Sequence, residues 1–215
     1  MSPSSPLFWM LVGLVAMIAL GPLVRFALAA ILGRAIGRDA LAAQPDAITL
    51  AVASADEWRD LETIERTALP LEAEGFVAAG DFAVVELPGV RVRLLAHEGR
   101  GWYAAIYEHQ QAGIWFDLFH SWVDGTGVTW TTSPPTGLED RPGHPAHRVS
   151  GAHPGELFLR ACREATAARL DAEPVSREEA SAVFCAAYAE WMAWRRVRGI
   201  SRQDVLRVAS RDLAA

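Results

Sequence analysis

Acidic, histidine and hydroxyl side chains gather between residues 117 and 132 of the chain. Asp117, His120 and Asp124 come first, and the threonines at positions 126, 129, 131 and 132 follow them. A carboxylate beside a histidine can orient the imidazole for proton transfer or share a metal ion with it. If the chain reverses at Asp124, several of these groups would meet across two strands. That arrangement would suit a hydrolase or a metal-dependent enzyme.

Strand geometry favours a structural explanation for the same residues. Asp117 and His120 are separated by an odd number of positions, so a regular strand places them on opposite faces. Asp124 is followed by Gly125, a pair typical of turns, and threonine is favoured in strands. The pattern therefore favours a hairpin over a catalytic cluster.

A second set of candidate ligands lies in a proline-rich stretch, where His144, His147 and His153 fall within ten residues. Imidazoles bind transition metals, but no cysteine or carboxylate joins them at a recognised metal-site spacing. A solvated loop is the favoured interpretation. No cofactor is predicted, because the G-x-G-x-x-G, G-x-S-x-G, H-E-x-x-H and C-x-x-C motifs are all missing.

All 20 basic residues are arginine, which excludes phosphate-loop and Schiff-base lysines. The net charge is −6, and three arginines precede the first acidic residue, so the remainder carries a charge of about −9. A surface this acidic argues against nucleic-acid binding. The two cysteines, Cys162 and Cys185, lie in helical patterns and are predicted to be buried thiols, with an oxidised pair as the alternative.

Tryptophan and arginine crowd one predicted helix end, at Trp191, Trp194, Arg195 and Arg198, with Arg196 between them. These residue types suit a membrane interface, which predicts a membrane contact. The alternative is structural: Trp191 continues the apolar stripe of the helix, and the arginines complement its C-terminus.

The N-terminal segment is the feature with the clearest predicted role. Residues 7–24 carry no charge, and apolar residues continue to position 32. A bilayer core needs roughly twenty helical residues, so residues 7–32 are long enough to span it. Ala27-Leu28-Ala29 resembles a signal-peptidase site, but no positive residue precedes the apolar run and the run is too long for a cleaved signal. A retained anchor is therefore favoured.

Charge asymmetry predicts the orientation of this anchor. No arginine precedes it, whereas Arg25, Arg34 and Arg38 lie near its end or follow it. Positive residues mark the cytoplasmic side of a span. The expected location is the inner (cell) membrane, with a single pass and the soluble domain in the cytoplasm.

The remaining pattern predicts an α+β fold. Residues 1–35 form the anchor, 36–53 a connector and 54–215 one soluble domain. Ser54 and Glu57 form a capping box that predicts a helix ended by Pro70 and Gly75. Five strand-like runs separated by short turns predict an antiparallel meander. The runs are Phe76–Leu87, Val90–His97, Trp102–His109, Gly113–Trp122 and Gly127–Thr132.

Two to three helices follow the predicted sheet, after a long loop at residues 133–154. The first helical pattern covers residues 155–170. A second capping box at Ser176 and Glu179 predicts a helix to Arg198, and Ser201 caps a short last helix. The aromatic residues of the meander are mostly expected to pack within the sheet, although they could also line a pocket: Trp102, Tyr103, Tyr107, Trp115, Phe116, Phe119, Trp122 and Trp130.

Short motifs across about half of the chain resemble a pattern in bacterial proteins that carry an N-terminal membrane helix. The motifs are Gly75-Phe76, Gly80-Asp81-Phe82, Asp124-Gly125-Thr126 and Thr129-x-Thr131-Thr132. That family has no assigned activity, so the resemblance implies none. From the sequence we expect a membrane-anchored, non-enzymatic binding or scaffolding domain. The alternative is the enzyme built on Asp117, His120 and Asp124.

Overall fold

The structure is a computed structural model that describes residues 35, 37–39, 41–134, 138–167, 171–201, 203–205 and 207. The chain divides into two compact units. The larger unit comprises Pro45–Pro135 and Asp140–Trp194, and the smaller comprises Met1–Gln44, Thr136–Glu139 and Arg195–Ala215.

The larger unit is built on a seven-stranded sheet in which the strands follow one another in chain order. Neighbouring strands are antiparallel except β6 and β7, which are parallel. The strands are β1 (Leu50–Val52), β2 (Val77–Val84), β3 (Val90–His97), β4 (Trp102–His109), β5 (Gly113–Ser121), β6 (Gly127–Thr131) and β7 (Ala146–Arg148). The predicted α+β class and the antiparallel meander are confirmed. The edge strands β1 and β7 were not predicted, because three residues are too few to show an alternating pattern.

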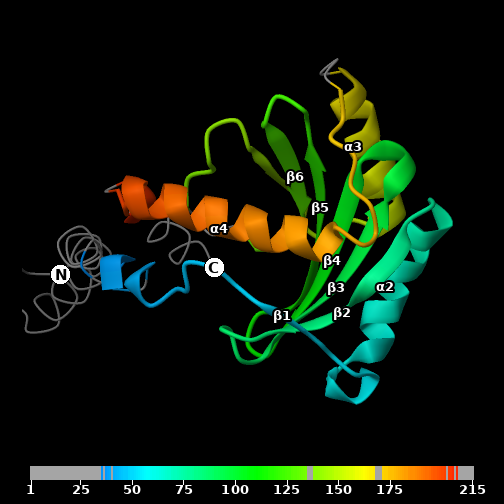
Figure 1. Cartoon of the computed structure of the whole chain (residues 1–215), viewed down its shortest axis with the longest axis horizontal. Helices are drawn as coiled ribbons and strands as arrows, with labels where there is room; N and C mark the ends of the chain where they lie inside the picture. The colour runs from blue at the N-terminus through cyan, green and yellow to red at the C-terminus, as the bar shows by residue number, and fades with distance from the viewer. Residues whose placement is uncertain are drawn as a thin grey trace, which may run out of the picture. The chain divides into compact units, whose positions relative to one another are not determined.

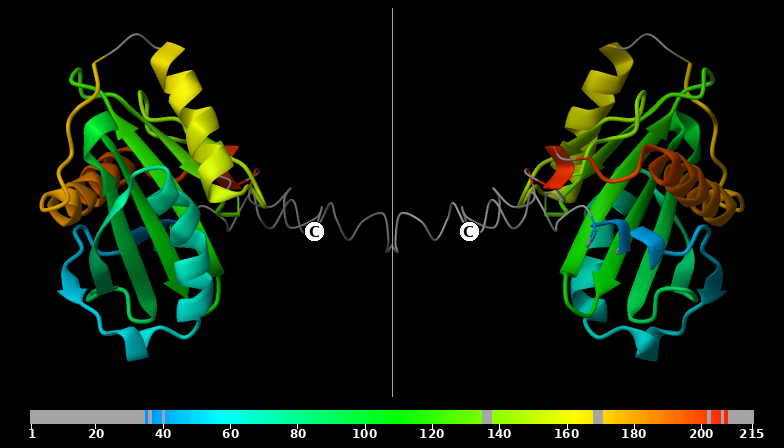
Figure 2. Two further views of the ribbon diagram at one scale, coloured as in Figure 1. Left: turned by 90° about the vertical axis from the view of Figure 1, so that its right-hand side faces the viewer. Right: turned by 90° about the vertical axis from the view of Figure 1, so that its left-hand side faces the viewer.

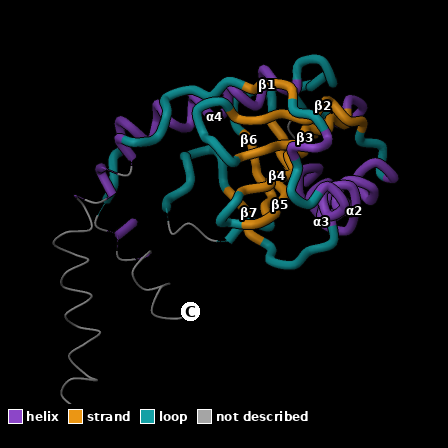
Figure 3. Tube along the Cα trace, turned by 90° about the horizontal axis from the view of Figure 1, so that it is seen from below, coloured by secondary structure: helices purple, strands orange, loops and turns teal. Residues whose placement is uncertain are grey.

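Helices cover both faces of the sheet, as Figures 1 and 2 show. The helical elements are η1 (Ala55–Glu57), α2 (Leu61–Ala73), η2 (Glu98–Arg100), α3 (Pro154–Ala167) and α4 (Ala180–Arg198). Residues of α2 and α3 share one apolar core with one face of the sheet. The first half of α4 packs on the opposite face (Figure 3). We call this second surface the α4-side face.

The first capping box forms, but it does not start the long helix. Ser54 accepts and donates hydrogen bonds with Glu57, and together they cap the short η1. The backbone then becomes extended at Trp58, and α2 begins only at Leu61 with Asp60 as its N-cap. The break has a tertiary cause, because a buried carboxylate of the sheet binds the backbone between the two helices.

Glu108 of β4 provides that carboxylate. Its two oxygens accept the backbone N–H groups of Arg59 and Asp60, at 3.0 and 2.9 Å. These N–H groups lie just before α2 and have no partner within the helix. Glu108 therefore fixes where α2 begins on the sheet.

Pro70 lies inside α2 rather than at its end, so the prediction that it closes the helix is wrong. The helix continues to Ala73 and ends where Gly75 adopts a φ of 100°, a left-handed conformation that favours glycine. Proline removes one backbone hydrogen bond of the helix, and packing on the sheet compensates for it. Ile64, Ala68 and Leu71 supply that packing.

The later helices follow the predicted pattern. The box at Ser176 and Glu179 forms and precedes α4, which ends at Arg198. Cys162 packs against the core beneath α3, and Cys185 packs against the core on the α4 side. Both are free thiols, since the sheet separates them.

Residues 7–32, the predicted anchor, lie outside the described part of the chain. Among the residues that are described, no helix is both long enough and apolar enough to cross a bilayer.

Candidate functional site

An acidic side chain lies among aromatic rings on the α4-side face of β4 and β5. The register places Tyr103 opposite Phe119, Ala105 opposite Asp117, and Tyr107 opposite Trp115. The first and third pairs are stacked, with ring centroids 4.6 and 4.8 Å apart and interplanar angles of 14° and 13°. Asp117 therefore lies between two stacked aromatic pairs, with the methyl group of Ala105 opposite it on β4.

Hydroxyl groups meet the carboxyl of Asp117 from both neighbouring strands. Thr131 of β6 lies directly opposite Asp117 in the register. Its hydroxyl and that of Tyr107 lie close enough to the carboxyl to lower its pKa, while the Thr131 hydroxyl donates its proton to Oγ of Ser133 at 2.8 Å. The Oδ1 atom of Asp117 is nevertheless buried and has no hydrogen-bond partner among the described residues. A buried acceptor without a donor is unfavourable, and natural structures seldom keep one without a reason.

Burial raises the pKa of Asp117 from 3.8 to about 7, because water is not available to stabilise the carboxylate. The hydroxyls of Thr131 and Tyr107 and the charge of Arg148 act in the opposite direction but do not cancel this effect. Burial, together with the charge of Asp117, also raises the pKa of Tyr103 and Tyr107. Both phenols therefore stay protonated and can donate hydrogen bonds at neutral pH.

The site keeps some exposure to solvent even though its centre is buried. Leu94 and Ala105 are fully buried, in the core that includes Phe184 of α4. The residues Tyr107, Trp115, Asp117 and Phe119 are only partly buried. We call the six residues Tyr103, Tyr107, Trp115, Asp117, Phe119 and Thr131 the Asp117 site.

The structure does not bring Asp117, His120 and Asp124 together. His120 lies on the other face, stacked on Trp102 with centroids 4.5 Å apart, and its Nδ1 is 3.1 Å from the carbonyl oxygen of Gly101. Burial lowers the pKa of His120. Asp124 lies in the exposed turn after β5, where its Oδ1 accepts the backbone N–H and the hydroxyl of Thr126 at 2.9 and 2.6 Å. Both residues therefore have structural roles.

The three loop histidines are also separate from one another. His147 stacks on Trp130 at 4.4 Å, and Nδ1 of His144 is 3.2 Å from the carbonyl oxygen of Pro142. The carbonyl of His153 accepts the N–H of Leu157 in the first turn of α3. Across the described residues, no three histidine, cysteine or acidic side chains gather as metal ligands.

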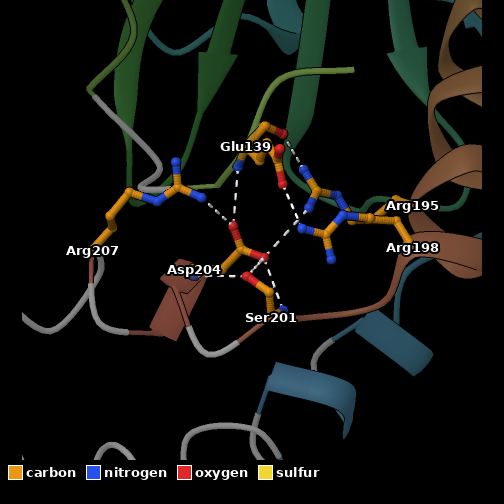
Figure 4. A network of polar contacts seen from close by, with 6 residues as sticks. All are labelled: Glu139, Arg195, Arg198, Ser201, Asp204 and Arg207. Atoms are coloured by element: carbon orange, nitrogen blue, oxygen red, sulfur yellow. Dashed lines mark hydrogen bonds and ion pairs between the residues drawn. The ribbon is translucent and has the colours of Figure 1, made fainter. Parts of the chain in front are cut away.

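The arginines at the end of α4 bind the chain itself, in the network that Figure 4 shows within the smaller unit. Arg195 is fully buried, donates to the carbonyl oxygen of Glu139, and lies 3.9 Å from the carboxylate of Asp204. Arg198 donates to the side chain of Glu139 at 2.7 Å. Asp204 forms a capping box with Ser201, at 2.8 and 3.0 Å.

The predicted membrane contact needs correction for Arg195, because a buried guanidinium has no surface to present to lipid. Arg198 is exposed but is paired with Glu139, while Trp191 and Trp194 are half-buried. Arg196 also points inward in the smaller unit and donates to the carbonyl oxygens of Leu41 and Gln44, both at 2.7 Å. The arginines thus tie the connector and the C-terminal segment to the helix.

The sequence predicts that the aromatic residues of the meander mostly pack within the sheet, with the lining of a pocket as the alternative. It does not connect four of them, Tyr103, Tyr107, Trp115 and Phe119, with Asp117. Sequence alone cannot show which rings pair across the strands.

The chain matches no known family model, and comparison with curated proteins and with solved structures finds no similar protein.

Proposed function

We propose that this chain is a membrane-anchored binding protein whose ligand occupies the Asp117 site. The observation that carries the proposal is the buried Oδ1 of Asp117, which has no hydrogen-bond partner in the described part of the chain, on a partly exposed aromatic surface. Because folding raises the pKa of the Asp117 carboxyl, its ionised form destabilises the fold at neutral pH. Groups that are unfavourable for stability concentrate at functional sites, where a ligand supplies the missing interaction.

The surroundings of Asp117 suit binding better than catalysis. Aromatic rings with a few well-placed polar groups are typical of ligand sites. The hydrolase alternative needs a base or nucleophile beside Asp117, and His120 lies on the opposite face of the sheet. We therefore do not propose an enzyme built on these residues.

The anchor is the second part of the proposal and rests on the sequence. Residues 7–32 hold the protein in the cell membrane with a single span, and the arginines that follow keep the soluble domain in the cytoplasm. A reporter fused after Ala215 tests the orientation. Activity of a reporter that works only in the periplasm would contradict it.

The binding role is tested by isolating the full-length protein from its membrane together with whatever it holds. Wild type, Asp117→Asn and a matched control, Asp171→Asn, are purified in parallel, and bound molecules are identified by mass spectrometry. Asp171 lies in an exposed loop, so its substitution makes the same charge change away from the aromatic rings. We expect a ligand or partner that is retained by wild type and the control and depleted at least tenfold in Asp117→Asn. Identical sets from all three proteins would contradict the proposal.

A further inference from the structure

We propose that the Asp117 site binds an organic ammonium ion, whose N–H group donates to the partly exposed carboxylate of Asp117 while its apolar body packs against the flanking rings. This inference rests on the proposed binding function and names the chemical class of its ligand.

The carboxylate of Asp117 lacks hydrogen-bond donors. An ionised aspartate accepts up to about four hydrogen bonds through two oxygens. Thr131 donates its hydroxyl proton to Ser133, and no described donor reaches Oδ1 of Asp117. A ligand with a charged N–H donor would complete this set, and bonds between charged partners are the strongest of this kind.

Aromatic rings surround the carboxylate of Asp117. The rings of Tyr103 and Phe119 lie on one side of Asp117 along the strands, and those of Tyr107 and Trp115 lie on the other. Aromatic rings attract ammonium groups, tryptophan and tyrosine most strongly, and they also cover an apolar body. One carboxylate among four rings therefore matches a ligand that is cationic at one end and apolar at the other.

The electrostatic field around Asp117 also favours a cation. Arg148 of β7 acts on Asp117, but it is itself 3.5 Å from the carboxylate of Asp140. Glu173 and Glu190 add negative potential at Tyr103. An anionic ligand would meet repulsion here, whereas a cation would be attracted.

The proposal also predicts how binding depends on pH. The titratable and charged groups around Asp117 are Tyr103 and Tyr107 on β4, Arg148 on β7, and Glu173 and Glu190, which act on Tyr103. Burial raises the pKa of Asp117 to about 7 and raises the pKa of both tyrosines above their ordinary value. An ammonium ligand favours the ionised carboxylate, so binding releases a proton and becomes tighter as the pH rises from 6 to 8.

The test compares three probes that share one skeleton: 2-phenylethylammonium, 2-phenylethanol and phenylacetate. Each is titrated against the full-length protein in nanodiscs of uncharged lipid, and binding is measured by saturation-transfer NMR at pH 6 and pH 8. We expect the ammonium probe to bind at least tenfold more tightly than the alcohol at pH 8, with a smaller preference at pH 6. Asp117→Asn should remove the preference, and Asp171→Asn should keep it. A urea unfolding curve for each variant confirms that it is folded.

The outcomes separate this inference from the proposed function. If the alcohol or phenylacetate binds as tightly as the ammonium probe, the ligand class is wrong while the site itself stands. If the ammonium probe binds Asp117→Asn and wild type equally, or if no probe binds, the inference is also overturned. The co-purification experiment above then decides the binding function independently.

Discussion

Replacing Asp117 with asparagine should stabilise the protein at neutral pH, although it removes a polar group from the centre of the candidate site. Asparagine has nearly the same shape as aspartate but cannot ionise. The difference between the two proteins therefore isolates the cost of charging Asp117 inside the fold.

The magnitude follows from the raised pKa. The carboxyl titrates near 3.8 when exposed and at about 7 in the fold. Each pKa unit corresponds to about 1.4 kcal/mol, so the full penalty of ionisation is about 4 kcal/mol. This value is an upper limit, because Asp117 is partly exposed and solvent lowers the cost of its charge.

The sign is fixed by proton linkage. Between pH 4 and pH 7 the folded chain holds a proton on Asp117 that the unfolded chain has lost, so the stability of the wild type falls as the pH rises. Above pH 7 both forms are ionised and the penalty is constant. The free energy of unfolding of Asp117→Asn should exceed that of the wild type by an amount that grows by up to about 3 kcal/mol between pH 5 and pH 8.

The assay is urea unfolding of the full-length protein in detergent micelles, followed by tryptophan fluorescence at pH 5, 6, 7 and 8. Asp171→Asn is the control and should track the wild type at every pH. If the difference in free energy of unfolding between Asp117→Asn and wild type stays constant from pH 5 to pH 8, burial does not raise the pKa of Asp117. That result would also remove the evidence that Asp117 belongs to a functional site.

Two further predictions concern the residues that position the helices. Glu108→Gln should lower the free energy of unfolding by about 1–3 kcal/mol, because an amide keeps only one acceptor for the N–H groups of Arg59 and Asp60. A loss no larger than that of the exposed control Glu62→Gln, measured in the same urea assay, would contradict it. Asp204→Asn should speed trypsin cleavage at Arg207 severalfold, since Arg207 donates to Asp204 at 2.7 Å within the capping box of Ser201. Unchanged cleavage at Arg207, followed by mass spectrometry, would show that this network does not hold the C-terminal segment.

Local features of the fold could be predicted from the sequence wherever neighbouring residues decide the outcome. The bounds of β3 and β4 agree with the predicted runs, because a Pro-Gly turn and glycine-rich turns delimit them. All three serine caps form hydrogen bonds with the acidic residue three positions later. The opposite orientation of Asp117 and His120 also follows from alternation within one strand.

The errors arose where distant residues compete with local preference. The capping box of Ser54 predicts the start of the long helix. Glu108, about fifty positions away, instead binds the backbone N–H groups of Arg59 and Asp60, and the helix starts at Leu61. Arg195 was read as a surface residue from its place at a helix end. One partner, Glu139, lies 56 positions away in the chain. The other, Asp204, lies beyond the end of the helix, and the fold brings both to Arg195.

The sequence by itself determined the order of the five meander strands, the opposite faces of Asp117 and His120, and the apolar character of residues 7–32. Only the tertiary structure decided what surrounds Asp117. The strand register sets Ala105 opposite it, stacks aromatic rings on either side and leaves Oδ1 without a donor among the described residues. A shift of that register would replace every one of these neighbours without changing a residue, which is why the site could not be predicted from the sequence.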